Sequence, residues 1–319
     1  MEETFGQPRS SLLSRYSDIA LAAVVIGIVG MLIVPLPTPM LDLLLTLNIS
    51  VSVLLLLTSI YIPHALKISV FPTLLLITTL FRLALNVSST RLILLNADAG
   101  EVIRAFGNFV VRGNYVVGGV IFLILTLIQF IVISKGSERV AEVAARFTLD
   151  AMPGKQMSID ADIRAGAIDQ EEGKRKRRDL ERESALFGAM DGAMKFVKGD
   201  TIAGMIITVI NVVGGLIIGV TQKGMEASDA ARIYTILTIG DGLVGQISAL
   251  LIATSAGVIV TRVQGEDADA HLGTDVTTQL TQHPKAIGIA GVMLVILGLV
   301  PGLPTLPFLL MGGIAGAGS

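Results

Sequence analysis

Two aspartates stand in apolar segments of the sequence, where an ionised carboxylate is costly unless it is paired or hydrated. Asp200 opens one apolar run, and Asp241 lies inside another, flanked by glycines in "IGDG". An aspartate in such a position is a candidate for relaying protons. The cations that could pair with Asp200 are Lys195 or Lys198, just before it, and Arg82 in an earlier apolar segment.

Each aspartate begins a stripe of small and polar residues at helical spacing. The stripes comprise Asp200, Gly204, Thr208, Asn211 and Gly215 on one helix, and Asp241, Gly245, Ser248, Ile252 and Ser255 on the next. Such stripes let helices approach closely and hydrogen-bond, so they can be packing surfaces as well as ion paths. Asp200 has a second interpretation, as a helix N-cap at the membrane interface, where the helix dipole favours an ionised carboxylate.

Motifs for other chemistries are absent from the sequence. "GK" at 154–155 lacks the other residues of a phosphate-binding P-loop. His64, His271 and His283 do not have metal-ligand spacing, and the chain has no cysteine. The net charge of −2 gives no basic excess for nucleic acid. We therefore expect neither an enzyme nor a bound cofactor. Protons are the expected coupling ion, because the candidate relay residues are carboxylates in apolar segments.

The composition is that of a polytopic membrane protein. The 319 residues are 52% hydrophobic and only 16% charged, against about 25% charged in soluble domains. The sequence predicts an all-α fold with about eight transmembrane helices, at 19–36, 41–62, 70–95, 116–134, 201–220, 233–260, 286–300 and 305–317. Arginine and lysine favour a cytoplasmic N-terminus, and the even count then leaves the C-terminus in the cytoplasm too.

The chain then divides into four parts. These are a cytoplasmic tail (1–18), transmembrane helices one to four (19–134), a cytoplasmic element (135–199) and transmembrane helices five to eight (200–319). The sequence ends at "MGGIAGAGS". We expect it to be the membrane part of a longer protein, without that protein's cytosolic domain.

The cytoplasmic element is predicted to be helical and folded. Arg139, Glu142, Arg146 and Asp150 form one charged stripe at helical spacing. "MPGK" is expected to break this helix, and Ser158 to cap a second one with Asp160 and Asp162 in its first turn. Gly166 is the expected C′ residue of that helix. A third helical stretch follows from 169 to 198, and its "KRKRR" could meet anionic lipids.

Three long motifs carry a resemblance to a known family. They are "GSERVAEVAARFTLDAMPGKQMSIDADIRAGAID", "GAMDGAMKFVKGDTIAGMIITVINVVGG" and "IGDGLVGQISALLIATSAGVIVTRV". With "FPTLLLITTLFRLALNVSSTRLILL", they closely resemble the FHIPEP family, the large export-apparatus proteins of bacterial flagella and type III secretion injectisomes. The resemblance covers essentially the whole chain, and the residues of these motifs favour the injectisome branch.

The resemblance implies an export gate in the bacterial inner membrane that couples the proton motive force to protein translocation. It implies a homo-oligomeric ring around small export-gate membrane proteins. An ATPase complex and chaperone–substrate complexes would act mainly through the absent domain. By motif match, the residues that the resemblance implies to be functionally important are Arg139, Arg146, Asp150, Lys195, Asp200 and Asp241. Lys155 and Asp160 are further docking candidates in the cytoplasmic element, and Asn211 and Arg82 are further proton-coupling candidates.

Two alternatives differ in class from an export gate. Composition alone equally allows a small-solute secondary transporter or ion channel, but the two halves show no convincing internal repeat. The other alternative is a structural ring scaffold whose carboxylates serve assembly only. It predicts that neutralising Asp200 alters assembly and export together.

Overall fold

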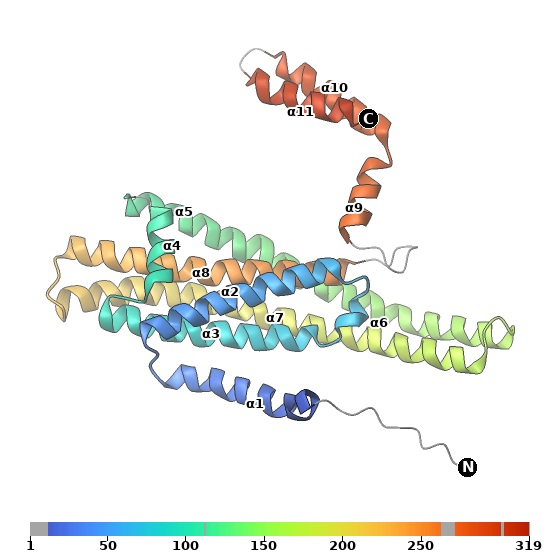
Figure 1. The fold of residues 1–319 in the computed structure, drawn as a ribbon, viewed down its shortest axis with the longest axis horizontal. Helices are drawn as coiled ribbons and strands as arrows, with labels where there is room; N and C mark the ends of the chain where they lie inside the picture. Colours follow the sequence, from blue (N-terminus) through green and yellow to red (C-terminus); the bar gives the residue numbers. More distant parts are fainter. Residues whose placement is uncertain (1–11, 112, 263–271, 301–302, 319) are drawn as a thin grey trace. The chain divides into compact units, whose positions relative to one another are not determined.

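The computed structural model describes residues 12–111, 113–262, 272–300 and 303–318. His271, residues 1–11 of the predicted tail and parts of the loops at 261–285 and 301–304 lie outside them. Helices account for the secondary structure of the described residues, which confirms the all-α prediction. The elements are α1 (Leu12–Ile33), α2 (Thr38–Tyr61), η1 (Ala65–Ile68), α3 (Phe71–Asn96), α4 (Glu101–Val111), α5 (Tyr115–Ile128), η2 (Gln129–Ser134), α6 (Lys135–Arg164), α7 (Gln170–Thr221), α8 (Ala227–Thr261), α9 (Leu272–Thr281), α10 (Pro284–Gly298) and α11 (Thr305–Ala317) (Figure 1).

Six helical segments within the described ranges are long and apolar enough to cross a membrane. They are Tyr16–Ile33, Thr38–Tyr61, Phe71–Asn96, Tyr115–Arg164, Gln170–Thr221 and Ala227–Thr261. The bent pair of α9 and α10 makes a seventh if it is one span. Helix α11 has 13 residues and rises only about 20 Å, against a hydrocarbon core of about 30 Å. The predicted count of eight is therefore not confirmed.

The chain forms two compact units. The first comprises residues 1–59 and 64–262, and the second comprises residues 60–63 and 263–319. Within the second unit, α10 packs on α11 through two glycines: a Cβ at Gly312 would lie 2.8 Å from the carbonyl oxygen of Gly291. All of the polar chemistry described below belongs to the first unit.

Helix α7 runs unbroken for 52 residues, a length of about 78 Å. Its N-cap is Asp169, whose carboxylate accepts a hydrogen bond of 2.7 Å from the N–H of Glu172. No proline interrupts the run that follows. Asp200 therefore lies in the middle of a helix, where neither free N–H groups nor a helix end are present. The N-cap interpretation of Asp200, and the dipole argument with it, is wrong.

The predicted break at "MPGK" is also wrong, because Pro153 lies inside α6. An interior proline costs a helix about 3 kcal/mol or more, and packing of α6 along α7 offsets that cost. Ser158 consequently caps no helix, and Asp160 lies near the end of α6 instead of in a first turn. The predicted C′ residue is confirmed: Gly166 has φ +73°, and its N–H donates to the carbonyl of Ile163 at 3.2 Å.

Helices α6 and α7 lie side by side as a hairpin (Figure 1). Lys155 bonds Glu183 across it at 3.3 Å, and Asp160 pairs with Arg177. Nearer the apolar part, Lys198 pairs with Glu138 at 2.8 Å. The helices continue without a break through 134–135 and 199–200, so no helix end marks the predicted borders of the cytoplasmic element. Those borders stay a prediction.

The glycines beside Asp241 serve close packing, not a break. Helix α8 is continuous through "IGDG". A Cβ at Gly240 would lie 1.9 Å from the carbonyl oxygen of Ile103 in α4, and a Cβ at Gly242 would lie 2.5 Å from the ring of Phe122 in α5. Only glycine lets α4 and α5 approach α8 this closely. These contacts hold Asp241 facing the other helices.

Candidate functional site

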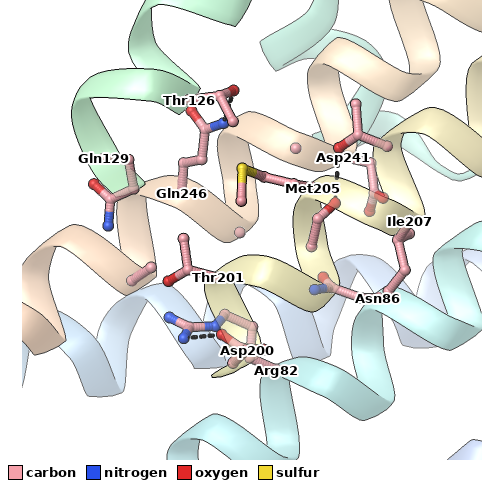
Figure 2. A pocket seen from close by; sticks show the side chains of 15 residues that line it. Arg82, Asn86, Thr126, Gln129, Asp200, Thr201, Met205, Ile207, Asp241 and Gln246 are labelled. Atoms are coloured by element: carbon pink, nitrogen blue, oxygen red, sulfur yellow. Dashed lines mark hydrogen bonds and ion pairs between the residues drawn. The ribbon is translucent and has the colours of Figure 1, made fainter. Parts of the chain in front are cut away.

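A small polar cavity lies between α3, the junction of α5 with η2, α7 and α8, and its volume is about 50 Å³ (Figure 2). The polar side chains that line it are Arg82, Asn86, Thr126, Gln129, Asp200, Thr201, Thr208, Asp241 and Gln246. Asp200 in α7 and Asp241 in α8, the two predicted relay residues, therefore line one cavity from different helices.

Asp200 has Arg82 as its cation. The two side chains form a buried ion pair between α7 and α3, with 3% and 2% of their surfaces exposed. Neither lysine near Asp200 in sequence reaches it, since Lys195 pairs with Asp191 at 2.8 Å and Lys198 with Glu138. Arg82 therefore does not extend to the membrane interface, as the long side chain of an arginine near a helix end can do. A pair this deep is costly to break from one side, because the remaining charge stays buried.

Asp241 is buried without an ion pair among the described residues. It is 6% exposed, and its Oδ2 lies 3.5 Å from the amide nitrogen of Asn211 in α7. Asn211 is itself completely buried. The hydroxyl of Ser89 in α3 also interacts with the Asp241 carboxylate. A buried carboxylate with so few polar contacts and no cation is weakly stabilised as an anion. Of the two aspartates, Asp241 is the one whose charge is not matched by a neighbouring cation.

Four atoms of the residues that line the cavity have no hydrogen-bond partner among the residues that the structure describes. They are Nη1 of Arg82, Nε2 of Gln129, Oδ1 of Asp200 and Oδ1 of Asp241. Two are donors and two are acceptors. A water needs about 10–15 Å³ of this kind of volume, so the cavity has room for a few waters. Water molecules could therefore satisfy all four atoms and join the carboxylates.

The two predicted stripes serve both purposes that the sequence allowed. Gly204 and Thr208 line the cavity. Further along, Gly215 is a packing position, since a Cβ there would lie 2.2 Å from the ring of Tyr234. On α8, Ser248 accepts a hydrogen bond of 2.9 Å from Asn48 in α2. The residues at the start of each stripe border the cavity, and those further along lie outside its lining.

Comparison with known proteins agrees with the motifs that the sequence carries. Residues 28–319 match the sequence profile described as the FHIPEP family. This chain belongs to the FHIPEP family. The resemblance stated from the sequence is thereby confirmed.

Three relatives illustrate the range of the similarity. The chain is 58% identical over 301 residues to low calcium response locus protein D of Yersinia pestis, covering 94% of this chain and 43% of the relative. It is 53% identical over 294 residues to secretion system apparatus protein SsaV of Salmonella typhimurium (92% and 43%). It is 53% identical over 306 residues to flagellar biosynthesis protein FlhA of Caulobacter vibrioides (94% and 43%). This FHIPEP chain thus spans less than half the length of these relatives, and no solved structure matches it.

The docking candidates that were predicted to be cytoplasmic lie on the α6–α7 hairpin, and none lines the cavity. Arg139 bonds Glu142 at 2.7 Å on an exposed surface. Arg146 and Asp150 are also exposed. Lys155 and Asp160 are held in the ion pairs that join α6 to α7. Lys195 is likewise 57% exposed and separate from the cavity.

Sequence reasoning missed several residues of the FHIPEP site. Gln129 and Thr126 in "LTLIQFIVIS" were not identified as candidates. A lone glutamine in an apolar span does, however, indicate a possible functional position. Gln246, whose amide donates to Thr126 at 2.6 Å, and Asn86 were also missed. Their side chains meet at the cavity only because four helices pack together.

Proposed function

We propose that this FHIPEP protein is the inner-membrane export-gate component of a type III protein secretion system. It couples proton entry to protein export. The observation that carries the proposal is a small cavity with room for a few waters, within membrane-spanning helices, which two buried aspartates and one arginine line. The names of its relatives, which refer to secretion and flagellar biosynthesis, support the same conclusion.

Proton binding at Asp200 is the step that changes the structure in this proposal. A hydronium in the cavity transfers its proton to Asp200, leaving water and a neutral carboxylic acid. Arg82 then holds a buried charge without an anion, which is unfavourable. The other carboxylate on the cavity is Asp241, and Arg82 moves toward it. Loss of the proton from Asp200 restores the original pair, so each proton moves α3 relative to α7 and back.

Movement at Asp200 reaches the α6–α7 hairpin through a rigid element. Helix α7 is continuous from the hairpin to Asp200, and the pair of Lys198 with Glu138 ties it to α6 at the base of the hairpin. Arg139, Arg146 and Asp150 are exposed on α6, where they would dock other apparatus components, including neighbouring copies in a ring. Both chain ends and the hairpin are assigned to the cytoplasm, and the exposed basic run 174–178 to the lipid headgroups. The injectisome branch remains our assignment of the system.

The size of this cavity argues against its being a binding site for a small solute. Sites for small molecules have volumes of about 300–1,000 Å³, whereas this cavity measures about 50 Å³. It suits water and protons. The experiment described next distinguishes the structural ring scaffold from the export gate.

The test is Asp200→Asn in the chromosomal gene, which keeps side-chain size but removes the titratable charge. Secretion is expected to fall by about a hundredfold or more, as for loss of a proton-transfer group. Assembly of the complex, measured by native gel in the same cells, is expected to persist. The matched control is Asp179→Asn, an exposed carboxylate on the same helix. Normal secretion would withdraw the proposal, and joint loss of assembly and secretion would support the scaffold.

A further inference from the structure

Helix α3 carries two buried polar side chains seven residues apart, Arg82 and Ser89, which are 2% and 0% exposed. Seven residues make almost two turns of an α-helix, so the two side chains leave α3 within about 20° of each other. Arg82 pairs with Asp200 of α7, and the hydroxyl of Ser89 interacts with the carboxylate of Asp241 of α8. One face of α3 therefore contacts both aspartates, each through a side chain of its own.

The hydroxyl of Ser89 has two acceptors for its one hydrogen. Besides the carboxylate of Asp241, the carbonyl oxygen of Asn86 lies 3.0 Å from it, one turn earlier on α3. A serine hydroxyl carries a single O–H donor, although its oxygen can accept two hydrogen bonds. The hydrogen can therefore be well aligned with only one of these acceptors at a time. The charge of Asp241 decides which one, because a hydrogen bond to a carboxylate is stronger than one between neutral groups.

The other groups around Asp241 supply no charge to it. Its second contact is the neutral amide of Asn211 on α7, and α5 contains no charged residue. Among the described residues, the charged side chains of the helices that surround this part of α8 are held elsewhere: Arg82 by Asp200, Arg91 by carbonyl groups of α1, Asp42 by the N-terminus of α4, and Glu101 and Arg104 at the surface of α4. Ser89 is thus the hydroxyl donor that responds to the charge of Asp241.

We propose that Ser89 is a positioning residue that links the protonation of Asp241 to α3, a proposal that rests on the function proposed above. While Asp241 is ionised, Ser89 donates its hydrogen to the carboxylate and ties α3 to α8. A hydronium in the cavity then gives its proton to Asp241, which leaves water and a carboxylic acid. The O–H of that acid donates to the oxygen of Ser89, and the hydrogen of Ser89 turns to the carbonyl of Asn86. A strong bond between α3 and α8 is thereby exchanged for a weaker one.

The exchange alters the part of α3 that also holds Asp200. Asn86, whose carbonyl receives the hydrogen, lines the cavity together with Arg82 (Figure 2). A serine that bonds a carbonyl one turn earlier in its own helix competes with the helix backbone and can bend it. Both aspartates therefore act on the same segment of α3, Asp200 through Arg82 and Asp241 through Ser89.

The experiment follows the protonation of Asp241 in the purified full-length protein by infrared spectroscopy. A protonated carboxyl group has a C=O stretching band that a carboxylate lacks, and the band that Asp241→Asn removes belongs to Asp241. In Ser89→Ala this band should persist to a pH about one unit higher, because the anion has lost a hydrogen-bond donor. Ser88→Ala makes the same change at a buried neighbour whose hydroxyl bonds the carbonyl of Met31. This control should leave the band at the parent pH.

Secretion of a type III substrate and native-gel assembly are measured in cells that carry the same variants. Ser89→Ala should lower secretion by about tenfold with assembly intact. Ser89→Thr keeps the hydroxyl and should retain both the parent band and the parent secretion. A Ser89→Ala protein that assembles poorly in cells still gives the infrared result.

Three outcomes would overturn the inference. An unchanged band in Ser89→Ala would show that the hydroxyl does not act on Asp241. A shift of equal size in Ser89→Thr would show that packing, and not the hydroxyl, sets the titration. A shifted band with normal secretion in Ser89→Ala would leave Ser89 without a role in export. Normal secretion in Asp200→Asn is a separate result, which withdraws the proposed function, whereas the infrared shift reports the contact of Ser89 with Asp241 by itself.

Discussion

At the scale of single residues, the site depends on which cation pairs with Asp200. Arg82 carries a planar guanidinium with several donors, so it can bond Asp200 and still direct Nη1 toward the cavity. The lysines near Asp200 in sequence are occupied by Asp191 and Glu138. A buried pair of this kind adds little net stability, but the loss of one partner is expensive.

The first prediction follows from that asymmetry. Arg82→Gln should lower the free energy of unfolding by about 3–5 kcal/mol, because it leaves the carboxylate of Asp200 buried alone. The double variant Arg82→Gln/Asp200→Asn should regain most of this stability without regaining secretion. Thermal unfolding of the purified protein measures the first effect, and substrate secretion the second.

The control is Arg104→Gln, which breaks the exposed pair of Arg104 with Asp98 and should change stability by at most about 1 kcal/mol. A protein with Arg82→Gln that unfolds at the parent temperature would show that the pair is not buried as described.

At the scale of helices, glycine contacts set how α4, α5, α7 and α8 pack around the cavity. Gly240 faces the backbone of α4, and Gly242 faces the ring of Phe122. Backbone atoms cannot move aside as a flexible side chain can. The position of Asp241 therefore depends on the glycines on either side of it, because a side chain at 240 or 242 would overlap with α4 or α5.

A pair of glycine substitutions tests this. Gly240→Ala should destabilise the protein by about 1–3 kcal/mol through overpacking, because its Cβ would lie 1.9 Å from the carbonyl oxygen of Ile103. Gly188→Ala on α7 has nothing within 4 Å of its Cβ and should be neutral or stabilising by up to about 1 kcal/mol. Thermal unfolding of both variants decides the matter, and equal effects would count against the α4–α8 contact.

At the scale of the whole molecule, one arrangement in the membrane accounts for the helices of the first unit. The α6–α7 hairpin, which joins the segments Tyr115–Arg164 and Gln170–Thr221, and the turn between α7 and α8 lie at opposite ends of these helices (Figure 1). Because the hairpin carries the basic run 174–178, the positive-inside rule predicts that the hairpin is cytoplasmic.

Reporter fusions test this orientation. Alkaline phosphatase, which is active only outside the cytoplasm, should be inactive when fused after Gly166 and active when fused after Gly224 or Gly113. The three glycines lie in turns between helices, so the fusions interrupt no helix. Activity at Gly166 would reverse the orientation and remove the hairpin from contact with cytosolic partners.

The sequence by itself determined the properties that depend on neighbouring residues. Apolar runs predicted the spanning helices that the first unit contains, and Gly166 was identified as a C′ residue because a positive φ favours glycine. Both aspartates could be singled out because a carboxylate in an apolar segment is rare and expensive. The family was also recognisable from the motifs alone.

Tertiary structure decided the rest. The partner of Asp200 is 118 residues away, so no local rule could choose Arg82 over a lysine two or five residues distant. Pro153 stays helical because α6 packs on α7, which overrides a local propensity. Gln129 lines the cavity from the π-helix η2, which no periodicity predicts. Interactions between residues close in sequence determine where the helices form, whereas the site arises from packing between segments far apart in the chain.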